Sequence, residues 1–184
     1  MFPYDLASNF LAESNDMNVL DIACGFGTGS VYLKQSGAKN VTGADISEEA
    51  VNHCISKYCD IEGLNFLCGD ALVLDFPENE LDLIVTIHTM EHVIDDNLFL
   101  KKLKSWLKPG SKIVLEVPLL MKYPFAESSE PYGHYHIREY EVGSLVNQFK
   151  KYFDLIDAYG VNRGFYTELK NARNAVLVVG QKHP

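Results

Sequence analysis

Positive charge is scarce in this chain of 184 residues. Lysine and arginine number 16 against 25 aspartates and glutamates, which gives a net charge of −9. Proteins that bind the phosphate backbone of nucleic acids present a basic face. The one local basic cluster, Lys101, Lys102, Lys104 and Lys108, has the spacing of the solvent side of a helix. We therefore expect no nucleic-acid partner.

Cysteines and long apolar runs are also few. The four cysteines, at positions 24, 54, 59 and 68, form no C-x-x-C pair and have no spacing with histidine that predicts zinc. No apolar run reaches 18 residues, and no basic segment precedes an apolar stretch at the N-terminus. We expect a cytoplasmic protein with reduced thiols, no membrane span and no assigned metal ligand.

Apolar runs alternate with helical patterns through the first 118 residues. Strands are predicted at 17–23, 40–45, 64–68, 81–87 and 111–117, and helices at 3–13, 28–36, 47–60 and 95–107. This rhythm predicts parallel strands joined by right-handed helical crossovers. An irregular stretch follows at 119–138, and then a helix at 140–151 and strands at 153–159 and 174–180.

The segment from Val19 to Ser30 is the most informative. An apolar strand that carries Asp21 runs into glycines at 25, 27 and 29 and opens a helix. Such a loop lets a ligand lie against bare backbone and the first N–H groups of the helix. A dinucleotide fingerprint requires G-x-G-x-x-G, whereas here the third glycine position is Ser30. The Asp21 carboxylate beside the loop suits an ammonium or sulfonium ligand better than a diphosphate.

Acids follow the next two strands. Asp45 lies twenty residues beyond Gly25, and an acid there can accept the hydroxyls of a ribose. Ile46 would offer an apolar face to an adenine. Asp70 follows the third strand in a Gly-Asp pair, a weaker signal because that dipeptide also forms turns.

Together these positions resemble motif I and the later acidic positions of the class I S-adenosylmethionine-dependent methyltransferases, over residues 17 to 180. The resemblance implies an α/β fold with a Rossmann-like, doubly wound, seven-stranded sheet that is mostly parallel and ends in an antiparallel C-terminal hairpin. It implies a single domain, 1–184, with a cofactor-binding half at 17–118 and an acceptor-side loop and hairpin at 119–184. The cofactor contacts that it implies are Asp21, Ala23, Gly25, Gly27, Asp45, Ile46, Asp70, Ala71 and His88.

The fourth strand leads into the first acceptor-side segment, Ile87-His-Thr-Met-Glu-His-Val93. The Asn/Asp-Pro-Pro-Tyr/Phe motif of members that methylate base or amide nitrogens is absent. Glu91-His92 is instead similar to an element of small-molecule and glycan-directed members, which makes His88 and His92 candidate bases or acceptor-orienting groups. Two alternatives are a metal site of His88, Glu91 and His92 and a purely structural role.

A second segment, from Gly133 to Tyr140, is similar to an element of members associated with glycan biosynthesis. The resemblance places His134, His136, Arg138 and Tyr140 near the acceptor. The alternative is that Arg138 only pins a loop to the sheet edge while the aromatic side chains fill gaps.

The sequence therefore predicts O-methylation of a sugar, a glycan precursor or another small metabolite, with S-adenosyl-L-homocysteine as the second product. One alternative is a metal-assisted O-methyltransferase of catechol-like acceptors, and another is a non-catalytic or partner-dependent cofactor-binding subunit. About sixteen residues precede motif I, so we expect that a second copy or a partner subunit can complete the site.

Overall fold

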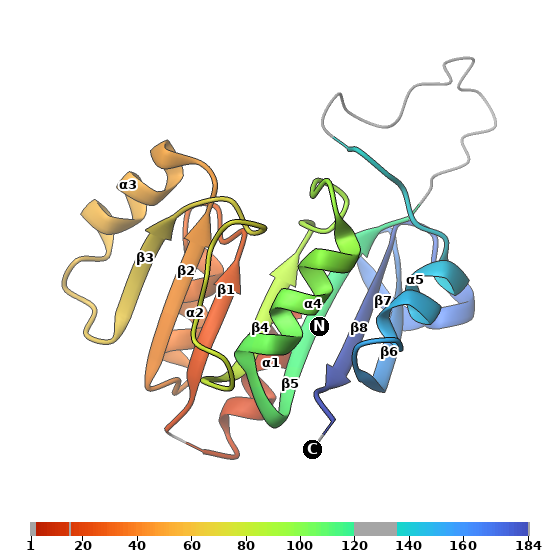
Figure 1. The fold of residues 1–184 in the computed structure, drawn as a ribbon, viewed down its shortest axis with the longest axis horizontal. Coiled ribbons are helices and arrows are strands. Elements are labelled where there is room, and N and C mark those ends of the chain that lie inside the picture. The colour runs from red at the N-terminus through yellow and green to blue at the C-terminus, as the bar shows by residue number, and fades with distance from the viewer. Residues whose placement is uncertain (1–2, 15, 120–135, 184) are drawn as a thin grey trace.

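The structure, a computed structural model, describes residues 3–14, 16–119 and 136–183. Within these ranges the strands form one eight-stranded sheet in the order β3-β2-β1-β4-β5-β8-β6-β7 (Figure 1). The strands are β1 (Asn18–Ile22), β2 (Asn40–Asp45), β3 (Leu64–Cys68), β4 (Leu81–Ile87), β5 (Leu107–Pro118), β6 (Asp154–Asn162), β7 (Phe165–Glu168) and β8 (Ala175–Gln181). The helices are α1 (Pro3–Leu11), α2 (Thr28–Gln35), α3 (Glu48–Lys57), α4 (Asp96–Trp106) and α5 (Val142–Phe149), with a 3-10 turn at Leu169–Asn171.

The first five strands form the parallel part of the sheet. β1 pairs in parallel with β2 and β4, and β3 and β5 extend the sheet on either side. The chain therefore builds outward from β1 in both directions, and the loops after β1 and β4 diverge at the edge where such sheets bind ligands. The Rossmann-like, doubly wound α/β fold that the sequence predicts is confirmed.

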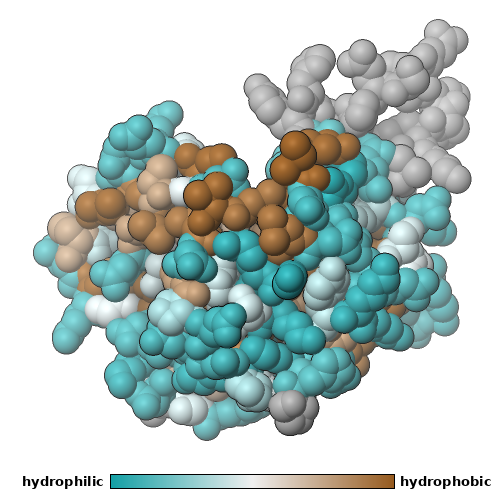
Figure 2. Space-filling view, viewed as in Figure 1, coloured by the Kyte–Doolittle hydropathy of each residue, from teal (hydrophilic) through white to brown (hydrophobic). Residues whose placement is uncertain are grey.

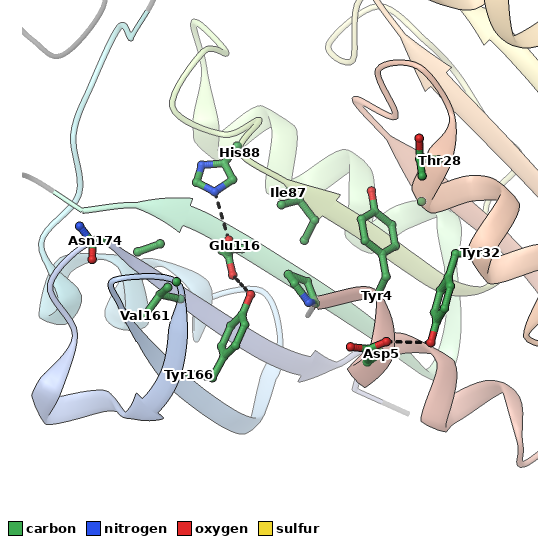
Figure 3. Close-up of a pocket in the computed structure, with 14 residues that line it drawn as sticks. Tyr4, Asp5, Thr28, Tyr32, Ile87, His88, Glu116, Val161, Tyr166 and Asn174 are labelled. Carbon is green, nitrogen blue, oxygen red and sulfur yellow. Dashed lines mark hydrogen bonds and ion pairs between the residues drawn. The ribbon is translucent and has the colours of Figure 1, made fainter. Parts of the chain in front are cut away.

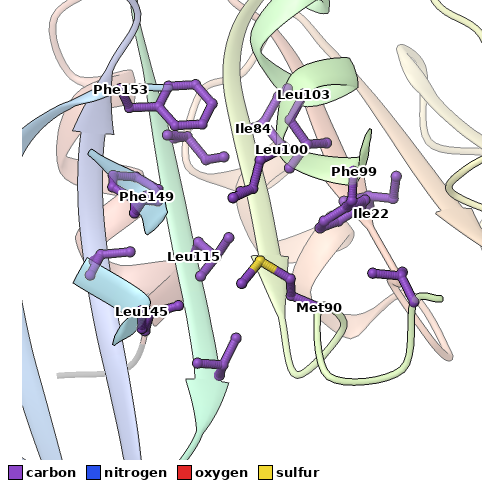
Figure 4. Packing of buried hydrophobic residues seen from close by; sticks show 14 of the residues in the cluster. Ile22, Ile84, Met90, Phe99, Leu100, Leu103, Leu115, Leu145, Phe149 and Phe153 are labelled. Atoms are coloured by element: carbon purple, nitrogen blue, oxygen red, sulfur yellow. The ribbon is translucent and has the colours of Figure 1, made fainter. Parts of the chain in front are cut away.

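Buried apolar side chains form one cluster on each face of the sheet. On one face, α4 and α5 pack their buried side chains over β1, β4 and β5, as with Phe99, Leu103 and Phe149 (Figure 4). On the other, Leu6 of α1 and Leu33 of α2 belong to the second cluster. The alternation of side chains along each strand divides the residues between the clusters. None of the helices in the described ranges has the length and apolar character that a bilayer crossing requires.

The sheet contains one strand more than the seven predicted. β6 and β8 pair antiparallel, as expected for the C-terminal pair, but β7 adds an outer strand beside β6. The two-residue turn between β6 and β7 is Arg163-Gly164, and both residues have positive φ, of 51° and 80°. Such turns favour tight hairpins, so the stretch between the strands predicted at 153–159 and 174–180 contains a hairpin.

The start of β5 corrects a second expectation. The predicted helix at 95–107 ends at Trp106, and Leu107 already pairs with β4. Pro109 and Gly110 therefore lie within β5 rather than after a helix, at an irregularity where the pairing with β4 shifts register. Leu98 of α4 is 41% exposed, because the buried face of this helix is formed by Phe99, Leu100, Leu103 and Trp106.

Candidate functional site

A cavity of about 480 Å³ opens at the carboxyl ends of the central parallel strands. Its wall contains six of the residues that the resemblance assigns to the cofactor: Ala23, Asp45, Ile46, Asp70, Ala71 and His88. Asp21, Gly25 and Gly27 do not line it. Apolar side chains gather along the hollowed upper rim of this face (Figure 2), and the cavity wall includes the exposed residues Ile46, Ile94 and Ile137.

The loop after β1 is fixed by Asp45. One carboxylate oxygen accepts a hydrogen bond from the Gly25 amide at 2.8 Å, and the other accepts one from the Ser47 amide at 2.9 Å. The two glycines of the loop differ in role. A Cβ on Gly25 would meet no atom within 4 Å, whereas a Cβ on Gly27 would lie 2.8 Å from Sγ of Cys54. Gly25 therefore keeps the backbone open, and Gly27 permits close packing.

The Asp21 carboxylate is buried beneath this loop rather than open to it. It accepts hydrogen bonds from the hydroxyl of Tyr4 at 3.0 Å and from that of Ser30 at 2.6 Å. Burial raises the pKa of Asp21 to about 6, despite these two donors. Ser30, which replaces the third glycine of a dinucleotide fingerprint, is thus used to hold Asp21, and Asp21 joins α1 to α2.

Two residues on the cavity wall have an unusual backbone. Ala23 and His88 have φ values of 63° and 53°, in the left-handed region that residues other than glycine rarely adopt. Ala23 directly follows β1 and His88 directly follows β4, and these two strands are neighbours in the sheet. Such strain is retained mainly at ligand sites, which supports this edge as the functional one.

His88 lies between two buried carboxylates. Its Nε2 atom is 3.1 Å from Oε1 of Glu116, and its Nδ1 atom is 3.5 Å from Oε1 of Glu91. The hydrogen bond to Glu116 and the contact with Glu91 raise the pKa of His88 to about 9. The side chain is therefore an imidazolium at neutral pH. Glu116 also accepts a hydrogen bond from the Tyr166 hydroxyl at 2.6 Å, and burial raises the pKa of Tyr166.

A second cavity, of about 630 Å³, lies on the other side of His88 (Figure 3). The N-terminal helices contribute Tyr4 and Tyr32, β5 contributes Glu116, and the hairpin of β6 and β7 contributes Tyr166. Among the described residues, His88 is the one that lines both this cavity and the first. The molecule thus offers two adjoining sites with a charged side chain between them.

The model of the methyltransferase domain family matches residues 20–115, just over half of the chain. The chain belongs to the class I S-adenosylmethionine-dependent methyltransferases. The cofactor of this family is S-adenosylmethionine, and the first cavity is lined by six of the nine residues that the family resemblance assigns to it. The methyltransferase motif and the cavity therefore agree on the same edge of the sheet.

The relatives of this methyltransferase are named for different methyl acceptors. It is 32% identical over 101 residues to phosphoethanolamine N-methyltransferase 3 of Arabidopsis thaliana, covering 53% of this chain and 20% of that protein. It is 30% identical over 100 residues to a fatty-acid O-methyltransferase of Mycolicibacterium smegmatis, covering 54% and 36%. A crystal structure of an S-adenosylmethionine-dependent methyltransferase from Mesorhizobium loti superposes with a TM-score of 0.72 at 18% identity over 98% of each chain. The chain thus spans well under half the length of the phosphoethanolamine and fatty-acid methyltransferases.

The segment that follows residue 135 is fastened to the turn after β4 of this methyltransferase. Arg138 pairs with Asp96 at 2.8 Å and donates to the carbonyl of Ile94 at 2.8 Å. The Tyr140 hydroxyl donates to the Met90 carbonyl at 3.3 Å. These contacts match the pinning role that was one of the two alternatives for Arg138. His134 lies outside the described residues.

Three residues that line the second cavity were not singled out by the sequence analysis: Tyr4, Glu116 and Tyr166. Glu116 had a usable signal, because it is a charged residue within the apolar run of β5. Tyr4 and Tyr166 had none, since the surface that each covers is set by tertiary packing. Tyr4 lies so close to α2 that a Cβ on Gly29 would be 2.1 Å from its ring, which explains the extra glycine of the motif.

Proposed function

We propose that this methyltransferase transfers the methyl group of S-adenosylmethionine to a hydroxyl of a sugar, a glycan precursor or another small metabolite held in the second cavity. The observation that carries the proposal is the shared wall at His88. Alkyl transfer requires the incoming lone pair to be aligned behind the reacting carbon. Donor and acceptor sites must therefore adjoin, as these two cavities do.

The first cavity has the groups that an adenosine needs. Each oxygen of Asp45 accepts one backbone hydrogen bond, and a carboxylate has about four lone-pair positions, so capacity remains for ribose hydroxyls. Asp70 uses Oδ1 for the Leu72 amide at 2.8 Å and keeps Oδ2 for the adenine amine. Ile46 is 70% exposed on the cavity wall, where an adenine ring would cover it.

The second cavity suits a hydroxylated acceptor. The rings of Tyr4, Tyr32 and Tyr166 offer flat apolar surface with polar tips. The carboxylates of Asp5 and Glu116 can accept hydrogen bonds from acceptor hydroxyls. Flat rings beside carboxylates favour a sugar or a phenol over a purely apolar chain.

The two charged groups at the boundary have separate roles in this proposal. S-adenosylmethionine supplies an activated methyl group. His88 is protonated and its two N–H groups face Glu116 and Glu91, so it does not remove a proton and instead orients the Glu116 carboxylate toward the acceptor. Glu116 is the buried carboxylate on the acceptor wall, and it takes the hydroxyl proton.

The proposal is tested in two steps. Calorimetric titration with S-adenosylhomocysteine, with NAD as the parallel control, establishes the cofactor in the purified chain. Sugars and phenols are then screened with S-adenosylmethionine while formation of S-adenosylhomocysteine is measured. We expect turnover with one of these hydroxyl classes. Cofactor binding with turnover only on amines or carboxylic acids would overturn the assignment of the acceptor.

The variant that tests the role of His88 between the two cavities is His88→Asn, because asparagine tolerates the positive φ at this position. We expect turnover to fall by about 10²-fold or more, with the affinity for S-adenosylhomocysteine retained. His53→Asn on the exposed side of α3 is the matched control. Equal turnover in wild type and His88→Asn would show that His88 has no role in the reaction.

A further inference from the structure

One carboxylate and two imidazoles, outside the proposed transfer chemistry, converge at the rim of the first cavity. One potential ligand atom from each of Glu91, His92 and His136 lies within 4.8 Å of the others. Glu91 and His92 belong to the turn after β4, whereas His136 precedes α5. The rings of His92 and His136 stand edge to face with their centroids 4.8 Å apart.

Glu91 is the unusual member of this set. Its side chain is fully buried, and within the described part of the chain neither carboxylate oxygen has a hydrogen-bond partner. The imidazole atoms that approach it are 3.5 Å away in His88 and 3.7 Å away in His92, longer than hydrogen bonds. The His88 imidazolium is shared with Glu116, so it compensates the charge of Glu91 only in part. A buried carboxylate without a hydrogen bond is costly, and a metal ion bound directly to Glu91 would reduce that cost.

The two stretches that carry the ligands are held together independently of any ion. The Ile137 amide donates to the Glu91 carbonyl at 3.0 Å, and Arg138 pairs with Asp96 just beyond the turn. His136 is therefore positioned beside Glu91 and His92 by contacts of its neighbours. Such support from surrounding residues is what a preorganised metal site requires.

We propose that Glu91, His92 and His136 bind a divalent first-row transition metal such as Zn²⁺. Two imidazoles and one carboxylate favour these ions over Mg²⁺ and Ca²⁺, which prefer all-oxygen ligands. Tetrahedral zinc holds its ligand atoms about 3.3 Å apart, so ligand atoms that lie within 4.8 Å of one another must close in by up to about 1.5 Å. His92, whose side chain is 40% exposed, has room to do so.

This set differs from the one that the sequence suggested. His88 belonged to that set, but its Nε2 atom is engaged with Glu116 at 3.1 Å, and His136 takes its place. A bound ion would link the turn after β4 to the segment at 136–138. His92 and Ile137 line the first cavity, so the ion would fix one rim of the cofactor site. The inference does not depend on which acceptor is methylated.

The test is a titration of the purified chain with Co²⁺, followed by its visible d–d absorption, and then competition with Zn²⁺. We expect a stoichiometric complex without the thiolate charge-transfer band that Cys59 or Cys68 would produce. His136→Ala should weaken Co²⁺ binding by about tenfold or more. The matched control is His183→Ala, which removes an imidazole paired with a carboxylate elsewhere on the surface, and it should bind as the wild type does.

A second readout is the thermal midpoint, which Zn²⁺ should raise in the wild type and in His183→Ala but not in His136→Ala. Glu91→Gln should also abolish binding, with retained S-adenosylhomocysteine binding as the check that this buried variant folds. Equal Co²⁺ affinity in wild type and His136→Ala would overturn the proposal. Loss of cofactor binding in the wild type would instead count against the proposed function, so the two failures are distinguishable.

Discussion

Nε2 of His88 lies 3.1 Å from Oε1 of Glu116, and this contact sits where the two cavities meet. An imidazolium at such a boundary carries the same charge as a sulfonium donor. Glu116 supplies the compensating negative charge, because its carboxylate is buried and in contact with the imidazole. The arrangement therefore allows two cations to approach each other without leaving the site with an excess of charge.

The stability of the protein should depend on pH through His88. Its pKa rises from 6.5 to about 9 on folding, so the stabilisation is fully present below about pH 6.5 and is lost as the pH rises through about 9. The His88 side chain is 49% exposed, so solvent screening limits its contribution to the free energy of unfolding to about 1 kcal/mol. Asp21 changes protonation near pH 6, below this window.

The measurement is urea unfolding of wild type and His88→Asn at a series of pH values from about 6 to about 10. The wild type should lose stability across this range, and the variant should lose about 1 kcal/mol less. Parallel pH profiles for the two proteins would show that the His88–Glu116 pair contributes nothing to stability.

Asp45→Ala should weaken binding of S-adenosylhomocysteine by roughly 1–3 kcal/mol. The substitution removes both the acceptor for the ribose hydroxyls and the hydrogen bond from the Gly25 amide that fixes the loop. Isothermal titration calorimetry gives the difference directly. Asp60→Ala, at an exposed position after α3, is the control. Unchanged affinity in Asp45→Ala would place the ribose elsewhere.

Gly29→Ala should destabilise the fold by about 1–3 kcal/mol. The new Cβ would lie 2.1 Å from the Tyr4 ring, so Tyr4 must move and its hydrogen bond to Asp21 is lost. Gly143 is a close match, because it too is the second residue of an eight-residue helix, and a Cβ there meets nothing within 4 Å.

Gly143→Ala should therefore be neutral or stabilising by up to about 1 kcal/mol. Urea unfolding of both variants decides the point. Equal effects of the two substitutions would mean that Tyr4 does not pack against α2 as described.

Local sequence signals predicted the parallel half of the sheet and the edge at which the first cavity opens. The apolar runs of β1 and β4 and the acids after β2 and β3 depend on neighbours in the chain, so Asp45 and Asp70 could be placed before the structure was known. The exposure of Leu98 and the place of Leu107 in a strand could not be predicted, because the buried face of α4 and the start of β5 depend on pairing with β4.

The second cavity was beyond the reach of sequence patterns for the same reason. Tyr4, Glu116 and Tyr166 are far apart in the chain and meet only because β5 lies between α1 and the C-terminal strands. The protonation of His88 likewise follows from Glu116, which is 28 residues away in sequence. A histidine near the end of a strand gives no sign of such a partner.

The most direct test of this account is a crystal structure of the chain with S-adenosylhomocysteine, in which the position of the sulfur atom is measured. We expect the adenosine between Asp45 and Asp70 in the first cavity and the sulfur beside His88, facing the second cavity. Adenosine in the second cavity, or a sulfur atom separated from His88 by other side chains, would contradict the assignment of donor and acceptor sites.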